Sequence, residues 1–215
     1  MVNDNLPRTI KSRRLERAVE TATEMYLSQG IENVKMTDIA DACGVGVATL
    51  YRYFGTKTGI TIAAMTHLWY DLAKMFSGVF ESEVFLSQTG HKQMVDLMKM
   101  FAVLYEAHPK FMKMLGEFDL FLIRENVPKD MLVDYDKSII NFYTIFERAY
   151  QTGLKDGTVR EIPKFKLFYL SFAHALMELG KKLIQGELLP SDDFSHAKDE
   201  LAMIIETASY YLRKE

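Results

Sequence analysis

The chain has little cysteine and little proline. A single cysteine, Cys43, among 215 residues excludes an internal disulfide and any cysteine-rich zinc site. The N-terminus shows no apolar signal core. The longest run without a charged residue, 58–70, is well short of the ~20 apolar residues that cross a bilayer. We therefore expect a cytoplasmic protein without a membrane span.

Signals for β-strands are also almost absent, because no alternating apolar run is bounded by Asn-Gly or Asp-Gly turns. Apolar residues recur instead at helical spacing, and four of the five prolines fall between these stripes. We predict an all-α fold of about nine helices: a small N-terminal module of three helices and a larger C-terminal helical bundle. The predicted helices cover residues 10–29, 37–43, 47–54, 57–77, 90–107, 109–124, 128–153, 163–187 and 192–213.

The net charge is −3, so no overall basic bias points to nucleic acid. The charge is nevertheless uneven, because five cations lie in the first 17 residues: Arg8, Lys11, Arg13, Arg14 and Arg17. This basic arm either contacts a DNA backbone or minor groove, or is a solvated terminus. For Arg13 and Arg14 the start of a helix is an unfavourable place on dipole grounds, which favours a phosphate partner.

Residues 36–54 follow the pattern of a helix-turn-helix, in which two short helices flank Cys43-Gly44-Val45-Gly46. Thr37 is expected to cap the first helix. Gly44 permits the left-handed backbone that a sharp turn between helices requires. The second helix of such a motif enters the major groove of DNA.

On a helical wheel of residues 47–54, Leu50 and Phe54 are the best buried anchors. The other side chains divide by chemistry. Methyl groups, a hydroxyl and a guanidinium can meet base edges, and these belong to Val47, Ala48, Thr49 and Arg52. Tyr51 and Tyr53 offer hydroxyls to phosphate oxygens.

Lys57 follows Thr56, which is expected to cap the next helix. A cation in a first turn opposes the helix dipole. A phosphate bound at that helix end would reverse this effect, since the helix terminus and the lysine would both attract it. The alternative is an ordinary solvated lysine.

These motifs resemble the N-terminal domain of the tetracycline-repressor (TetR) family of bacterial transcription regulators. The resemblance covers about residues 13–60 and rests on Gly30-Ile31, Met36-Thr37-Asp38-Ile39-Ala40, Cys43-Gly44-Val45, Thr49-Leu50-Tyr51-Arg52-Tyr53-Phe54 and Thr56-Lys57. It implies DNA contacts at Thr37, Val47, Ala48, Thr49, Tyr51, Arg52, Tyr53 and Lys57. The chain departs from the family pattern at Gly46, where Ser is frequent, at Ala48, where Gly is common, and at Thr58-Gly59, where an acidic residue is usual.

The resemblance further implies a homodimer that binds a near-palindromic operator in double-stranded DNA and is released by a small-molecule effector. We expect residues 1–57 to form the DNA-binding domain and residues 58–215 the ligand-binding and dimerisation domain, with the helix over 57–77 connecting them. In the family, the last two helices, here 163–187 and 192–213, pack against their copy in the dimer.

The body after residue 78 is rich in methionine and aromatic residues. Most of these are expected to form core, but adaptable and flat side chains can also line an apolar ligand cavity. From side-chain type and helix face alone, the candidate pocket residues are Met98, Phe101, Tyr105, Phe118, Tyr143, Phe146, Phe172 and His174.

Other patterns are weaker. His67 and Asp71 are one helical turn apart, but no third metal ligand is in view. No Ser-His-Asp order or Gly-rich phosphate loop is apparent, so we expect no enzyme activity, no metal and no cofactor. The main hypothesis is a ligand-responsive repressor. The alternative is a dimeric small-molecule-binding or adaptor protein on the same scaffold without operator binding.

Overall fold

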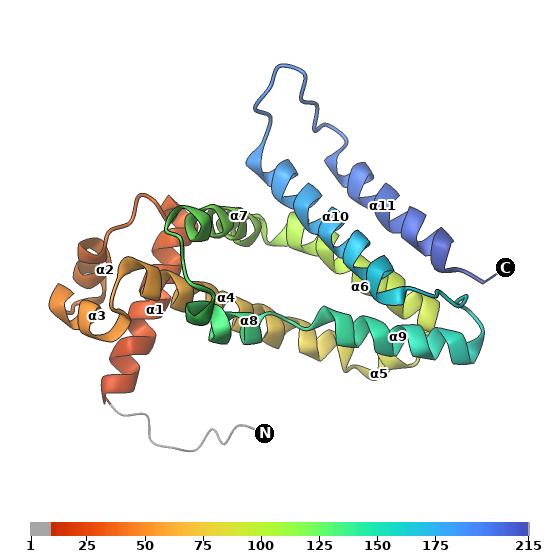
Figure 1. Ribbon diagram of the computed structural model, residues 1–215, viewed down its shortest axis with the longest axis horizontal. Coiled ribbons are helices and arrows are strands. Elements are labelled where there is room, and N and C mark those ends of the chain that lie inside the picture. Colours follow the sequence, from red (N-terminus) through yellow and green to blue (C-terminus); the bar gives the residue numbers. More distant parts are fainter. Residues whose placement is uncertain (1–9, 215) are drawn as a thin grey trace. The chain divides into compact units, whose positions relative to one another are not determined.

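The computed structural model describes residues 10–214, and their side chains from residue 13 onward. In this range the chain is helical without any strand, apart from an isolated antiparallel bridge between Val159 and Arg213. The all-α prediction is confirmed (Figure 1). The described residues form eleven α-helices and one 3₁₀ helix, whereas about nine helices were predicted. The elements are α1 Ile10–Gln29, α2 Met36–Cys43, α3 Val47–Phe54, α4 Lys57–Phe80, α5 Glu83–Leu86, α6 Gly90–Ala107, α7 Pro109–Arg124, η1 Lys129–Leu132, α8 Val133–Ser138, α9 Phe142–Asp156, α10 Phe165–Gln185 and α11 Ala197–Leu212.

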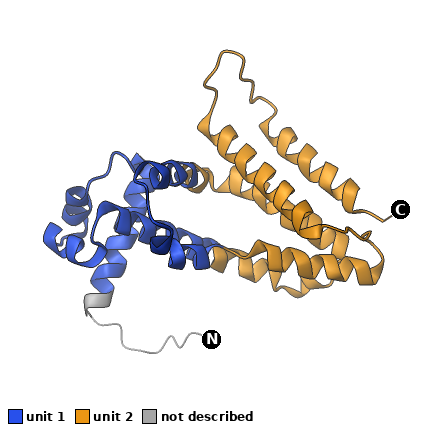
Figure 2. Ribbon diagram, viewed as in Figure 1, with its two compact units in different colours: residues 1–72, 114–139 blue, residues 73–113, 140–215 orange. Residues whose placement is uncertain are grey.

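The chain divides into two compact units (Figure 2). The first unit consists of residues 1–72 and 114–139, and the second of residues 73–113 and 140–215. Helices α4 and α7 therefore each contribute residues to both units. The functional division at residue 57 stays a prediction.

The core of the first unit is built from apolar residues repeated at helical spacing. In α1, Ala18, Ala22 and Tyr26 are buried at intervals of four residues. The Tyr26 hydroxyl is hydrogen-bonded to the hydroxyl of Thr61 on α4 at 3.1 Å. This buried pair ties α1 to the beginning of α4, the helix that follows the helix-turn-helix segment.

In the second unit, α6 packs against α9, α10 and α11. The approach of α6 to α9 is backbone to backbone, because a Cβ atom on Gly90 would lie 2.0 Å from the amide nitrogen of Gly153. The Gly90 N–H donates to the carboxylate of Asp156 at 2.8 Å. Two glycines and one acidic side chain thus join the start of α6 to α9.

The single helix predicted over residues 128–153 is wrong. The chain there forms η1, α8 and α9, with an extended residue at Ile139 after α8. The Asn141 side chain accepts a hydrogen bond from the Thr144 N–H at 3.2 Å and starts α9 as its cap. In α8, the Tyr135 hydroxyl accepts from Trp69 Nε1 at 3.1 Å. The apolar stripe continued through this segment, so periodicity alone did not reveal the break.

The predicted helices before residue 125 agree closely with the observed ones, and the later ones are shorter than predicted. Helix α10 covers 165–185 rather than 163–187, and α11 begins at 197 rather than 192. The short α5 lies in a stretch predicted to be a loop. Among residues 10–214, none of the helices has the length and apolar character needed to cross a membrane.

Candidate nucleic-acid interface

Helix α2 begins one residue earlier than predicted, and its capping differs. Thr37 lies within the first turn, exposed, with its hydroxyl 3.4 Å from a carboxylate oxygen of Asp38. Asp38 instead accepts a hydrogen bond from the Lys35 N–H at 2.8 Å. The expectation that Thr37 caps α2 was wrong, because Lys35 occupies the cap position and Asp38 reaches back to it. The Thr37 hydroxyl therefore does not cap α2.

The turn between α2 and α3 has the predicted left-handed residue. Gly44 has a φ of 69°, and its N–H donates to the carbonyl of Asp41 at 3.2 Å. The next amide, of Val45, donates to the carbonyl of Ala40 at 3.0 Å. These bonds end α2 and redirect the chain, so that α3 starts only three residues later.

Helix α3 is held to its unit mainly by Leu50, which is 1% exposed. Phe54, the second predicted anchor, is half-buried. Tyr51 is 50% exposed and Val47 36% exposed. One narrow buried stripe therefore leaves most of this short helix open to a partner.

Of the residues implied as base or phosphate contacts on α3, Val47, Ala48, Tyr51 and Arg52 are exposed, and Thr49 and Tyr53 are half-buried. The Arg52 guanidinium lies 5.1 Å from the centroid of the Tyr53 ring. Such a cation–π contact restrains a long side chain without using its hydrogen-bond donors. The Arg52 donors are thus presented on an exposed face.

Gly46 occupies the N-cap position of α3 and supplies no side-chain hydrogen bond. Its carbonyl accepts from the Thr49 N–H at 2.8 Å. The first amides of a helix without a side-chain cap are available to water or to an anion.

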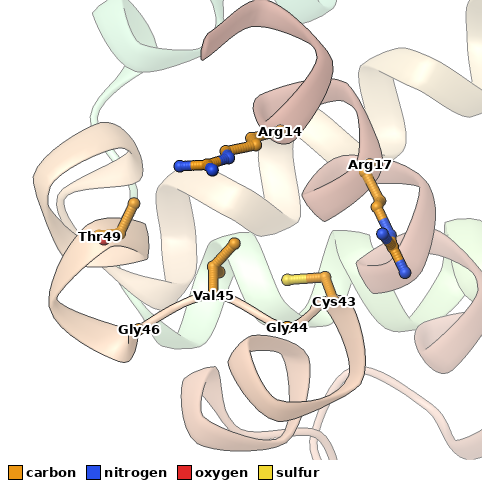
Figure 3. A pocket seen from close by; sticks show the side chains of 7 residues that line it. All are labelled: Arg14, Arg17, Cys43, Gly44, Val45, Gly46 and Thr49. Carbon is orange, nitrogen blue, oxygen red and sulfur yellow. The ribbon is translucent and has the colours of Figure 1, made fainter. Parts of the chain in front are cut away.

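Two arginines of α1 border this turn. Arg14 and Arg17 are exposed, and their side chains extend from α1 beside the turn (Figure 3). Together with Cys43–Gly46 and Thr49, they line a hollow of about 410 Å³. Of the other residues of the basic arm, Arg13 is exposed, Arg8 lies outside the described residues, and the Lys11 side chain is likewise not described. Arg14 and Arg17 thus place positive charge beside the turn between α2 and α3.

Lys57 is the first residue of α4. The predicted cap is confirmed, because the Thr56 hydroxyl accepts from the Gly59 N–H at 3.4 Å. The Lys57 ammonium donates to the carbonyl of Glu32 at 3.3 Å. Burial lowers the pKa of Lys57, while the carboxylate of Glu32 opposes that effect. The lysine is therefore held against the loop between α1 and α2 rather than extended into solvent.

The eight candidate pocket residues are not gathered in one unit. Phe118 is buried in the first unit, whereas the other seven belong to the second. Among those seven, Met98, Phe101 and Phe146 are buried, Tyr105, Tyr143 and Phe172 are half-buried, and His174 is exposed on α10. The Tyr143 hydroxyl is 3.2 Å from the carboxylate of Glu147. Their role in ligand binding stays a prediction.

Aromatic rings from α9 and α10 nevertheless form a continuous cluster in the second unit. The Tyr169 ring lies 5.2 Å from Tyr143 and 5.5 Å from Phe146, centroid to centroid. Phe165 stacks on Tyr150 at 3.8 Å. Phe165 and Tyr169 were not among the predicted pocket residues, although both lie on the same stripe of α10 as Phe172, which a helical wheel shows.

A second hollow, of about 560 Å³, lies on α6 and α11 and was not predicted. It is lined by apolar residues, among them Ala102, Val103, Ala202 and Ile205, and by charged residues of both helices. Among the described residues, no three His, Cys, Asp or Glu side chains are grouped so as to hold a metal ion.

Residues 18–64 match the family model of the bacterial regulatory proteins of the tetR family. No curated protein sequence matches the chain. Among solved structures, a TetR transcription regulator from Haloarcula marismortui is similar with a TM-score of 0.68 at 15% identity, over 94% of this chain and 97% of that one.

Two further similar structures contain ligands. A protein from Saccharomonospora viridis, described as a transcriptional regulator and in complex with choline, has a TM-score of 0.66 at 19% identity, over 95% of this chain and 100% of that one. The regulator FadR from Bacillus subtilis, in complex with stearoyl-CoA, has a TM-score of 0.59 at 14% identity, over 92% and 99%. The N-terminal segment 18–64 therefore matches the tetR family of bacterial regulatory proteins, and the chain has the fold of solved TetR-family regulators.

Proposed function

We propose that the protein is a cytoplasmic, homodimeric repressor that binds a near-palindromic operator and is released by a small, largely apolar or aromatic ligand. The observation that carries this proposal is the exposed face of α3, where Arg52 lies one turn from Ala48 and Thr49 on a helix anchored by Leu50. A helix presented in this way suits the major groove.

In this proposal the side chains of the interface have different roles. Arg52 reads guanine, and Val47, Ala48 and Thr49 contact base edges. Tyr51, Tyr53, Thr37 and Lys57 bind phosphates and fix the register. The hollow that Arg14 and Arg17 line adds a further place for a backbone phosphate, because it also includes Gly46, the N-cap residue of α3 that supplies no side-chain hydrogen bond.

The dimer is proposed to form through α10 and α11. Three large apolar side chains on these helices are unusually open to solvent: Leu167 is 59% exposed, Met203 68% and Tyr210 84%. Apolar side chains of this size are normally covered, and together they suit a self-complementary contact between two copies. A two-fold axis also matches two half-sites on DNA.

The ligand is proposed to bind in the second unit. Support comes from the aromatic cluster of α9 and α10 and from the choline and stearoyl-CoA bound by the two similar proteins. Ligand binding would favour a conformer whose two recognition helices no longer match successive grooves, which requires different affinities for the two conformers.

One observation favours the alternative, a small-molecule-binding or adaptor protein that does not bind an operator. The Lys57 ammonium already has a protein partner, the Glu32 carbonyl. In that case Lys57 would stabilise the fold and contribute nothing to DNA affinity.

Selection of duplexes from a random double-stranded library, followed by gel shifts, tests the proposal. The unchanged protein should enrich one near-palindromic sequence. Arg52→Ala should lose discrimination at one base pair in each half-site by about 1–3 kcal/mol, whereas Lys110→Ala, an exposed cation outside the interface, should not. If no sequence is enriched and binding does not depend on salt, the alternative is favoured.

A further inference from the structure

Helix α7 contacts the loop that joins α1 to α2. The Ile31 N–H donates to the carboxylate of Glu117 at 2.9 Å, across 86 residues of sequence. Gly30, just before it, has a φ of 84°, and a Cβ atom there would lie 3.0 Å from a Glu117 carboxylate oxygen. Glycine at position 30 thus leaves room for the Glu117 carboxylate beside the loop.

A second contact joins α7 to the same loop. The Arg124 guanidinium, in the last turn of α7, forms an ion pair with the Glu32 carboxylate. It also lies 5.7 Å from the centroid of the Phe121 ring. Residues 31 and 32 are therefore held by two side chains of α7 that are seven residues apart, which is two turns of one helix face.

The loop in turn holds Lys57. The backbone carbonyl of Glu32 accepts the hydrogen bond from Lys57 Nζ, while the side chain of Glu32 is directed to Arg124. An ammonium has three donors, so two remain for a phosphate. Lys57 begins α4 immediately after the turn that ends α3.

The charges around Lys57 make the Arg124 contact significant. Burial and the Arg124 guanidinium lower the pKa of Lys57. Three carboxylates raise it, those of Glu32, Glu125 and Asp38. Three acids would oppose the approach of a phosphate. Arg124 pairs with the first of them and also with Glu125, which reduces the negative field at this helix end.

We propose that Glu117 and Arg124 are positioning residues for DNA binding: they hold residues 30–32, the loop whose Glu32 carbonyl binds Lys57, and Arg124 neutralises the Glu32 carboxylate. This inference rests on the proposed function. Neither residue needs to contact DNA, because both act through the loop. Lys57 is then a shared group, with one donor fixed by the protein and two presented to the phosphate.

The test measures the affinity of full-length variants for the duplex that the unchanged protein selects. Arg124→Ala should weaken binding about fivefold, the scale of one exposed ion pair. Glu32→Gln removes both the ion pair and the acid, so its two effects oppose each other and it should bind within about twofold of the unchanged protein. The double variant Arg124→Ala/Glu32→Gln should regain the affinity of Glu32→Gln within about twofold, because the acid that required neutralisation is gone.

Unchanged affinity of Arg124→Ala would overturn the proposal. A loss that the double variant does not rescue would also overturn it, since Arg124 would then contact DNA itself. Lys110→Ala, which removes an exposed cation elsewhere on α7, controls for net charge. A change in the salt dependence supplies a further readout, because losing one phosphate contact reduces the slope of log K against log salt by about 0.9.

Glu117 is tested by two variants. Glu117→Gln keeps an oxygen that accepts the Ile31 N–H, and should bind within about twofold of the unchanged protein, whereas Glu117→Ala should bind about tenfold more weakly. Amide hydrogen exchange of residues 30–34 should quicken in Glu117→Ala and Arg124→Ala but not in Lys110→Ala. If the unchanged protein selects no duplex, the proposed function fails. Exchange then still decides whether α7 holds the loop, and unaltered exchange rules out the positioning role.

Discussion

The carbonyl oxygen of Phe54 lies against Gly59 so closely that a Cβ atom on the glycine would be 1.9 Å from it. The same carbonyl accepts the Thr56 N–H at 2.8 Å. The last residue of α3 therefore rests directly on the first turn of α4, and Gly55, with a φ of 71°, makes the turn between them. This contact defines how α3 is joined to the rest of its unit.

Gly59→Ala is expected to destabilise the protein by about 3 kcal/mol, because neither the carbonyl nor the α4 backbone can move freely. Thermal unfolding followed by circular dichroism measures the effect. Gly78→Ala is the matched control on the same helix, since a Cβ atom there meets nothing within 4 Å. That variant should gain about 0.5–1 kcal/mol. Equal stability of the two variants would show that the Phe54 contact imposes no constraint.

The local features of the helix-turn-helix segment could be predicted from sequence because each depends on neighbouring residues. Gly44 in the left-handed region, Leu50 as the buried anchor and Thr56 as the cap of α4 all follow from spacing and residue type. Gly59 was noted only as a departure from the family pattern. Glycine is required at position 59 because the Phe54 carbonyl lies against it. This contact across a turn cannot be seen in a single sequence.

Contacts between distant parts of the chain could not be predicted from the sequence. The hydrogen bond from Ile31 to Glu117 and the ion pair between Glu32 and Arg124 join segments whose separation in sequence carries no periodic signal. The break before α9 was missed for a related reason. Asn141 is a good cap, but a continuous apolar stripe suggested an uninterrupted helix.

Asp156 should make the second unit sensitive to acid. Burial acts to raise the pKa of Asp156, but hydrogen bonds from the Thr158 hydroxyl and from the amides of Gly90 and Thr158 outweigh it and hold the pKa below its usual value. A lowered folded-state pKa stabilises the fold above the unfolded value of about 3.9, and this contribution disappears as the pH falls through the folded pKa.

Asp156→Asn should therefore be less stable than the unchanged protein at about pH 6, and the difference should shrink toward about pH 3. Urea unfolding at both pH values measures it. Asp130→Asn, which removes an exposed carboxylate of η1, provides the comparison. A difference that stays constant with pH would mean that the carboxylate is not the stabilising form.

Phosphate contacts made by Arg14 and Arg17 of α1 should be measurable in the salt dependence of DNA binding. If Arg14 and Arg17 each neutralise a phosphate beside the start of α3, alanine at either position reduces the slope of log K against log salt by about 0.9 per contact, and a dimer loses two contacts. Affinity should fall to a similar degree for all sequences, in contrast to Arg52→Ala. Titrations at several salt concentrations measure the slopes. If the slope equals that of Lys110→Ala, these arginines do not contact DNA phosphates.

The exposed apolar side chains of α11 should hold the dimer together. Met203 is 68% exposed in the single chain, and covering a methionine stabilises a complex by about 1.5–3 kcal/mol. A two-fold contact counts it twice, so Met203→Glu, which also places two like charges in the interface, should weaken dimerisation at least about a hundredfold. Sedimentation velocity over a range of concentrations measures the shift to monomer.

Leu120→Glu is the matched control for that substitution, because Leu120 is exposed to a similar extent, 65%, but lies on α7. It should remain dimeric. If both variants dissociate, the contact extends beyond α10 and α11, and if only Leu120→Glu dissociates, the interface lies elsewhere. Monomeric Met203→Glu should also lose most of its affinity for a two-site operator, since each half-site is then bound alone without the gain from linked binding. Retention of full affinity by the monomer would separate DNA binding from dimerisation and contradict the proposed two-fold mode of recognition.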